Sequence, residues 1–294
     1  MLKGLTFRQN YFDDPAGLRG LTDLLQDIFG IDIGLLQQFG GLDPSSMPFG
    51  YFDDAGRCVA NFSAFSMPLI VNGKMIRATG YQSGAVRPEF RGQGLYRDLM
   101  QRAFAWAHAS GSNVGLLLTK EPSLYEKFGF HTLPQHKFCG PTPEFRPIEG
   151  EVRHLNLQTR ADVVIIDSLL SNRQPVSNRF SIVRQTEMFF FNAECDPPIT
   201  LSLIPKLNAV IAWKLTEDAG LMLLDIAAPQ IPPLSAILSC LNVPAGRVEV
   251  CFPTDRLGWE GQPVAYDGAC SLMSSGMAHE TIMEPFMLSP MAEF

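Results

Sequence analysis

The chain has 294 residues, of which 46% are hydrophobic and 18% are charged, a composition that supplies a real core and excludes a disordered chain. The net charge of −7 disfavours a nucleic-acid binder, and no apolar run approaches the ~18 residues of a membrane span. The six cysteines are scattered without a CxxC pair, and the first residues contain no apolar signal-peptide core. We therefore expect a cytoplasmic protein with reduced thiols.

The first half of the chain alternates between strand-like and helix-like patterns. Turn signals separate the strands, and Asn72-Gly73 in particular favours a hairpin. Leu95, Leu99 and Ala103 recur at helical spacing. Strands are expected at 5–8, 49–52, 58–71, 75–86, 114–118 and from 130, and helices at 15–30, 33–39, 94–109 and 123–128.

The second half repeats this order without the first strand, which predicts two modules of one architecture. Helices are expected at 160–170, 178–192 and 234–241, and strands at 199–204, 209–215, 221–227, 247–252 and 270–273. The segment 140–150 is rich in proline and glycine, so the modules should join there. The fold class expected is mixed α/β, with one domain at 1–142 and another at 150–294.

One segment has the pattern of an anion-binding turn: residues 85–100 read AVRPEFRGQGLYRDLM. A strand here runs into a glycine-containing turn and then directly into a helix. Such a turn points several backbone N–H groups at one place, and the positive end of the helix dipole favours an anion there. Gly92 and Gly94 allow close approach, and Arg91 adds charge. An ordinary tight turn is the alternative; the spacing is neither that of a Walker loop nor that of a dinucleotide motif.

This segment resembles motif A of the GNAT acetyltransferase superfamily, in which Arg91, Gly94 and Tyr96 occupy the Arg/Gln-x-x-Gly-x-Gly/Ala positions. Downstream, SLYEKFGF at 123–130 looks like the Leu-Tyr-x-x-x-Gly-Phe signature of that superfamily. The close resemblance covers residues 45–140.

Two departures point to a subgroup. Tyr96 replaces the small last residue of motif A, which would put a larger side chain beside the pyrophosphate. The asparagine that often precedes the second signature is replaced by TKEP at 119–122. Both features are similar to the two-module, enhanced-intracellular-survival type of GNAT protein, although we expect this chain to lack the extra C-terminal domain of that type.

The resemblance implies that acetyl-CoA binds at the turn and along the strand end, where it would make main-chain bonds. The residues implied are Ala85, Val86, Arg87, Arg91, Gly92, Gln93, Gly94, Leu95 and Tyr96. It also implies that Tyr125 acts as the general acid that protonates the leaving thiolate. A half-buried packing role is the alternative for Tyr125.

The general base stays open, because residues 75–87 contain no aspartate or glutamate. The candidates are a water positioned by Gln82 or Tyr81, the side chain of His131, and the carboxylate of Phe294. The fraction of the amine that is already deprotonated could also react without a base. No metal is expected, since the histidines have no partners at ligand spacing. In the second module, the place of the phosphate loop at 225–233 contains three prolines and neither arginine nor glycine. We therefore expect a degenerate module that walls the acceptor pocket, with the aromatic cluster 189–191 either in that wall or in the core.

These observations favour an acetyl-CoA-dependent N-acetyltransferase that moves an acetyl group directly to a primary amine of a small molecule or peptide. The alternatives are an acyl-CoA sensor or scaffold with a vestigial site, and another acyltransferase built on tandem GNAT modules. The expected partners are acetyl-CoA and an amine acceptor, without nucleic acid or membrane. The sequence leaves open a homo-oligomer, the identity of the amine and any ligand of the second module.

Overall fold

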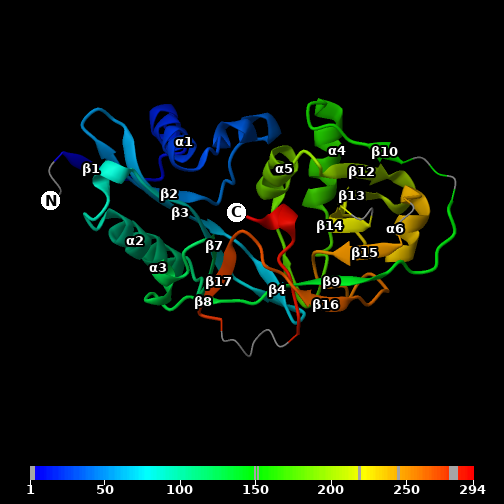
Figure 1. Cartoon of the computed structure of the whole chain (residues 1–294). Helices are drawn as coiled ribbons and strands as arrows, with labels where there is room; N and C mark the ends of the chain where they lie inside the picture. Colours follow the sequence, from blue (N-terminus) through cyan, green and yellow to red (C-terminus); the bar gives the residue numbers. More distant parts are fainter. Residues whose placement is uncertain (1–3, 149, 151, 218–219, 244–245, 278–283) are drawn as a thin grey trace.

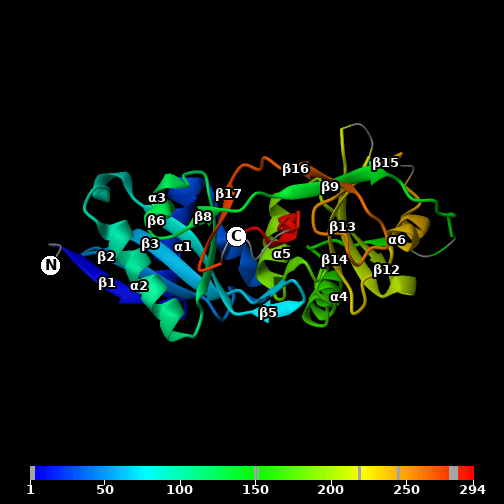
Figure 2. The same ribbon diagram turned by 90° about the horizontal axis from the view of Figure 1, so that it is seen from below.

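The structure is a computed structural model that describes residues 4–148, 150, 152–217, 220–243, 246–277 and 284–294. It contains two seven-stranded sheets and one three-stranded sheet. The two large sheets lie side by side along the long axis of the molecule, and the segment at the C-terminal end lies between them (Figures 1 and 2). In the part of the chain that is described, none of the helices has the length and apolar character needed to cross a membrane.

The first sheet has the strand order β1-β2-β3-β6-β7-β17-β8. Two helices cover its opposite faces (Figure 1): α1 packs through Leu21, Leu24 and Leu25, and α2 packs through Leu95 and Leu99. The strands are β1 (Leu5–Gln9), β2 (Met47–Asp53), β3 (Cys58–Ser66), β6 (Ala78–Val86), β7 (Val114–Thr119), β8 (His131–Thr132) and β17 (Ser271–Ser275). The helices of this half are α1 (Pro15–Phe29), η1 (Ile33–Phe39), η2 (Pro88–Phe90), α2 (Leu95–Ala109) and α3 (Ser123–Glu126).

Local signals explain where α1 begins and ends. Asp14 caps its first turn by accepting a hydrogen bond from the N–H of Ala16, Pro15 occupies the first position, and Gly30 ends it in the left-handed conformation.

The second sheet has the order β10-β12-β13-β14-β15-β9-β16. Helices α4 and α5 pack on one face through a core that includes Ile166 and Phe189, and α6 covers the other through Leu234 and Ile237. The strands are β9 (His136–Pro141), β10 (Arg153–His154), β12 (Thr200–Ile204), β13 (Ala209–Leu215), β14 (Leu221–Ala227), β15 (Arg247–Val250) and β16 (Gln262–Ala265). The helices are α4 (Arg160–Ser171), α5 (Thr186–Cys195), η3 (Pro205–Leu207), α6 (Leu234–Leu241) and η5 (Pro290–Ala292).

Strands cross between the halves in both directions. β9, from the first half, lies between β15 and β16 of the second sheet. β17, from the second half, lies between β7 and β8 of the first. The small sheet also joins the halves, because β11 (Phe180–Ile182) pairs with β4 (Leu69–Val71), which pairs with β5 (Lys74–Ile76). The division at 1–142 and 150–294 stays a prediction about domains, but the sheets are not divided there.

Several expected elements differ in the structure. The helix expected at 178–192 is wrong in its first part, where β11 forms instead and α5 begins only at Thr186. All three residues of β11 are buried, because the edge of β4 provides hydrogen-bond partners that local sequence does not reveal. The runs 58–71 and 75–86 each divide into two strands, segment 33–39 is a 3-10 helix, and β16 was not expected.

Candidate active site

Strands β6 and β7 separate in the middle of the first sheet. They pair in parallel only where Ala78–Tyr81 face Val114–Leu117. Beyond that point β6 contains a bulge: Ser83 has a positive φ of 56°, and the buried Asn61 donates a hydrogen bond to the Ser83 carbonyl. Within the described residues, the edge of β6 that faces β7 therefore has no strand partner after Tyr81.

The glycine turn before α2 is an anion cradle. Gly92 and Gly94 have φ angles of 76° and 80°, a region that L side chains rarely adopt. Gly94 is the N-cap of α2, and no side chain caps the helix. In the part of the chain that is described, no carbonyl or side chain accepts a hydrogen bond from the N–H groups of residues 92–96. These groups and the helix dipole are available for a phosphate.

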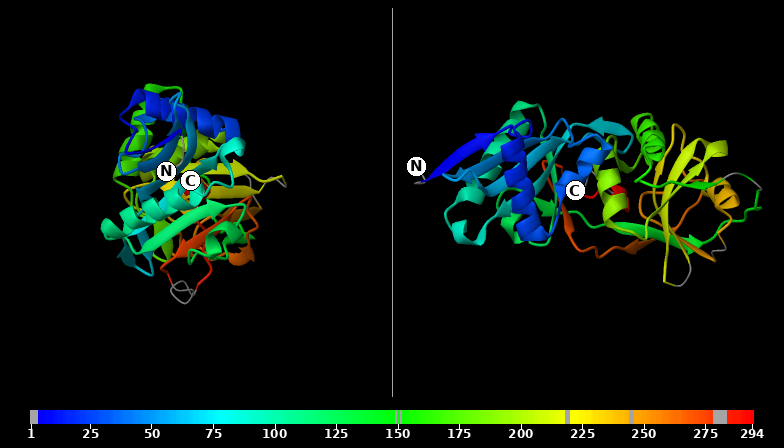
Figure 3. Two further views of the ribbon diagram at one scale, coloured as in Figure 1. Left: turned by 90° about the vertical axis from the view of Figure 1, so that its left-hand side faces the viewer. Right: turned by 90° about the horizontal axis from the view of Figure 1, so that it is seen from above.

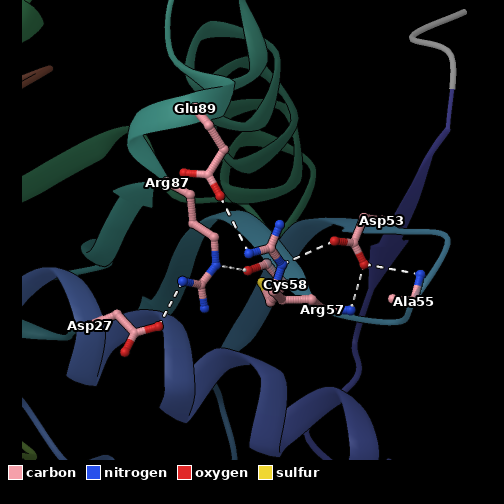
Figure 4. Close-up of polar contacts among 7 residues, drawn as sticks. All are labelled: Asp27, Asp53, Ala55, Arg57, Cys58, Arg87 and Glu89. Carbon is pink, nitrogen blue, oxygen red and sulfur yellow. Dashed lines mark hydrogen bonds and ion pairs between the residues drawn. The ribbon is translucent and has the colours of Figure 1, made fainter.

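The residues expected to bind acetyl-CoA have different roles in the structure. Arg87 is buried, and its side chain donates to the Cys58 carbonyl at 2.9 Å and to the Asp27 carboxylate at 2.6 Å (Figure 4). Its N–H donates to Val59 across the sheet, so Arg87 holds the strand and α1 together. Arg91 is exposed beside the turn, with its Nε on the Val86 carbonyl at 3.2 Å.

Tyr96 does not point toward the cradle. Its hydroxyl lies 2.5 Å from that of Tyr125, and a Cβ added to Gly84 on β6 would come within 2.3 Å of it. The ring also packs edge-on against Phe62. The expectation of a bulky side chain beside the pyrophosphate is therefore corrected: Tyr96 lies between α2, β6 and α3.

The two phenols titrate differently. Burial raises the pKa of Tyr125, and hydrogen bonds with Tyr96 and Thr119 offset part of that rise. Burial also raises the pKa of Tyr96, and the neighbouring Tyr125 raises it further. Tyr96 therefore also stays protonated at neutral pH, and either hydroxyl can donate in the hydrogen bond between them. Tyr125 is 8% exposed and stays protonated at neutral pH.

A cavity of about 350 Å³ lies beside the gap between the strands. Gln82 and Leu118, each one residue past the last β6–β7 pair, line it. Met188 and Phe191 on α5 line it from the second half, together with Glu293. Both halves of the chain therefore build this cavity, and it lies where β6 and β7 separate.

The candidates for a general base differ in whether they line the cavity. Gln82 lines the cavity, and so does Phe294, whose ring packs edge-on against Phe65. His131 does not line this cavity; it lies on β8, opposite Ser274. In the aromatic cluster 189–191, only Phe191 lines the cavity, while the other two are fully buried in the core.

The sequence did not point to most of the polar residues of the cavity, among them Ser46 and Glu293. Ser46 follows a loop, and Glu293 belongs to the last segment, so neither stands near a motif. Across the described ranges, no group of three or more His, Cys, Asp or Glu side chains is arranged to hold a metal ion.

Comparison with known proteins explains the cradle and the gap. Residues 42–133 match the family model described as "Acetyltransferase (GNAT) domain". Over this range the chain is similar to GNAT acetyltransferase domains. An uncharacterised N-acetyltransferase from Streptomyces griseus is 33% identical over 94 residues, which cover 32% of this chain and 22% of that protein. The chain thus matches less than a quarter of the length of this GNAT relative.

Several solved structures resemble nearly the whole chain. A probable N-acyltransferase from Enterococcus faecalis V583 is 12% identical, with a TM-score of 0.60 over 95% of this chain and 74% of that one. Eis1 from Mycobacterium abscessus is 13% identical, with a TM-score of 0.59 over 91% and 72%. These likenesses confirm the expected mixed α/β, Eis-like fold. The family model confirms the GNAT resemblance that the two motifs indicated.

Proposed function

We propose that this GNAT protein transfers an acetyl group from acetyl-CoA directly to a primary amine. The observation that supports this most is the alignment of three features along one strand. The free N–H groups of residues 92–96 lie just beyond the end of β6, the edge of β6 is open after Tyr81, and the cavity begins at Gln82.

The residues assigned to acetyl-CoA fit that substrate by their free donors. The N–H groups of Gly92 to Tyr96 would hold the pyrophosphate, with Arg91 adding charge. The open edge at Ala85 and Val86 would bind the pantetheine arm as an added strand. Leu95 contributes only its N–H, because its side chain is buried under the sheet. Arg87 is removed from this set as a direct contact.

Tyr125 would protonate the sulfur as the carbon–sulfur bond breaks. Its hydroxyl forms a hydrogen bond with Thr119 at the end of β7. Thr119 directly follows Leu118, which lines the cavity. In this proposal, residues 1–142 carry the cosubstrate, and residues 150–294 supply one wall of the acceptor cavity.

The first test is cosubstrate binding. Acetyl-CoA at about 100 times its Kd should stabilise the folded protein by about 2.7 kcal/mol and raise its Tm. Gly94→Val should remove this shift, because a β-branched residue strains the left-handed position and turns the amides away. Gly56→Val is the matched control: it also has a positive φ in an open turn but lies outside the cradle.

The second test is turnover with Tyr125→Phe, using release of free thiol with a panel of amines. The substitution should lower kcat by about 100- to 10,000-fold with unchanged acetyl-CoA affinity. Tyr51→Phe is the control, since it also removes one hydrogen-bonded hydroxyl, here bonded to Asp98, from the same core. Binding of acetyl-CoA without turnover on any amine would favour a sensor or scaffold instead.

A further inference from the structure

We propose that the cavity at the β6–β7 gap selects an amine attached to an apolar body, and that the Glu293 carboxylate receives the amine nitrogen and takes up its proton. This inference rests on the proposed acetyl transfer and identifies its acceptor class and its base.

The walls of the cavity are mostly apolar and come from distant parts of the chain. They include Phe12, Ile31, Ile33, Leu36, Leu42 and Phe191. A hydroxyl-rich acceptor would lose hydrogen bonds to water on entering such a cavity without replacing them, whereas an aliphatic or aromatic body would gain free energy from burial. The volume of about 350 Å³ accommodates a small ligand.

The polar groups in these walls differ in whether they have a partner. The Ser46 hydroxyl is buried without a partner in the described structure. Asp43 is already neutralised, because it lies 3.0 Å from the Arg184 guanidinium and accepts from the Ser45 N–H. Among the described residues, no hydrogen bond or ion pair engages the Glu293 carboxylate. Of the two acidic side chains in the cavity wall, Asp43 and Glu293, only Glu293 therefore lacks a counter-ion among the described residues; Phe294 lies in the same wall, and its terminal carboxylate adds a second negative charge.

The fold holds Glu293 in place through its backbone. The Asn192 side-chain amide on α5 donates to the Glu293 carbonyl at 2.9 Å. The preceding Ser289 hydroxyl donates to Asp225 on β14 at 2.7 Å. Helix α5 and the C-terminal segment lie together between the two large sheets (Figure 1 and the right-hand view of Figure 3).

The groups that face Glu293 leave its carboxylate available. Lys214 on β13 lowers the pKa of Glu293, but it lies 2.9 Å from Asp196 and is neutralised there. Tyr266 and Cys270 line the same cavity and are uncharged at neutral pH, because burial raises the pKa of each. Burial is the largest influence on Glu293 and raises its pKa, which makes the carboxylate a better proton acceptor.

The proposed acetyl transfer conserves atoms and charge. Glu293 accepts one proton from the bound ammonium group, and the freed nitrogen lone pair forms a bond to the thioester carbon. The carbon–sulfur bond breaks with its electron pair on sulfur, and Tyr125 gives that sulfur a proton. The second nitrogen proton passes through water to restore the phenol, and Glu293 releases its proton to solvent. The products are the acetamide, CoA thiol and one proton.

The acceptor class is tested with amines that differ only in the attached body. Hexylamine should exceed ethanolamine in kcat/KM by about 10- to 100-fold, because each buried methylene favours binding several-fold. Ala269→Trp should erase most of this preference. Ala269 lines the cavity but is exposed, so the substitution fills the mouth without disturbing the core. Equal or better use of ethanolamine or of spermidine would overturn the apolar-body assignment.

The base is tested with Glu293→Gln, and Glu144→Gln, an exposed carboxylate outside the cavity, is the matched control. Glu293→Gln should lower kcat/KM for hexylamine by about 100-fold or more, with unchanged Kd for acetyl-CoA. In the parent protein, kcat/KM should fall as pH drops through the raised pKa of Glu293, and this acid limb should vanish in the variant. A retained limb, or activity within threefold of the parent, would overturn the role of Glu293.

The pH dependence of the Tm tests the surroundings of Glu293 independently of activity. Burial raises the pKa of Glu293, so its contribution to folding is favourable at low pH and is lost as pH rises through that pKa. Glu293→Gln should therefore raise the Tm at pH 8, and this gain should shrink on acidification. A lower Tm at pH 8 would mean that the carboxylate has a stabilising partner in the protein, which contradicts the proposal.

The failure of this inference is distinguishable from failure of the proposed function. If acetyl-CoA neither stabilises the protein nor reacts with any amine, acetyl transfer itself is wrong and the cavity assignment falls with it. If acetyl-CoA is bound and consumed with polar amines in preference to apolar ones, acetyl transfer stands and only the assignment of the acceptor is wrong.

Discussion

Two phenol groups meet where α2 and α3 approach the open strand edge. Tyr96 and Tyr125 share a hydrogen bond of 2.5 Å. Burial raises the pKa of both phenols; the hydrogen bond offsets part of this rise for Tyr125 and adds to it for Tyr96. Tyr96 would thus stabilise the phenolate that forms when Tyr125 gives up its proton. The general form of motif A has a small residue at this position, so the pair depends on the departure at Tyr96.

Tyr96→Phe should separate positioning from packing. The variant keeps the ring against Phe62 and loses only the hydroxyl. Because the donor to Tyr125 is gone, the pKa of Tyr125 should rise, and the basic limb of the kcat–pH profile should move to higher pH. One hydrogen bond contributes about 1 kcal/mol, so kcat at pH 7 should fall by about 3- to 10-fold. An equal loss with an unmoved basic limb would assign Tyr96 a packing role only.

At the scale of elements, a buried ion pair joins the segments that carry Glu293 and Phe191. Asp225 is fully buried on β14 and lies 2.6 Å from Arg173, which follows α4. It also accepts from Gln185, at the start of α5, and from Ser289 in the C-terminal segment. One carboxylate therefore fixes α5 and the C-terminal segment against the second sheet.

Asp225→Asn should lower the free energy of unfolding by about 3–5 kcal/mol, because it leaves the Arg173 charge buried without a counter-ion. Adding Arg173→Met should recover part of this loss. Glu89→Gln is the control: it removes an exposed pair with Arg57 (Figure 4) and should cost at most about 1 kcal/mol. Urea titrations of the parent protein and the three variants measure these differences. Equal losses for Asp225→Asn and Glu89→Gln would contradict the role of Asp225 in holding α5 and the C-terminal segment against the second sheet.

At the scale of the whole molecule, exchange of strands ties the two halves into one folding unit. β17 completes the first sheet between β7 and β8, and β9 lies inside the second between β15 and β16. Removing either half would leave a gap in one sheet and expose the edges of its neighbours.

A fragment of residues 1–142 should therefore not fold. It keeps β9 without its partners and lacks β17, which lies between β7 and β8 in the first sheet, so we expect aggregation and no cooperative thermal transition by circular dichroism. The full chain should unfold in one transition, with coincident midpoints by circular dichroism and tryptophan fluorescence. A monomeric fragment with a cooperative transition would show that the halves are independent.

Much of the first half was open to prediction because its signals are local. Gly92 and Gly94 permit a turn that few other residues adopt, and the helical spacing of Leu95, Leu99 and Ala103 makes one buried face. The hairpin at Asn72-Gly73 is confirmed with both residues at positive φ, as a tight two-residue turn requires. Backbone sterics act between neighbours in sequence, so such elements are determined wherever the segment is placed.

The sequence by itself determined the strand–turn–helix cradle, the position of Tyr125 after β7 and the GNAT resemblance they carry. Only the tertiary structure decided that β11 is a strand, that β17 enters the first sheet, that Tyr96 turns toward Tyr125 and that Glu293 lies in the cavity. Strand pairing and burial depend on partners far away in the chain, and a side chain such as Glu293 acquires its proton affinity from the surroundings that those partners build.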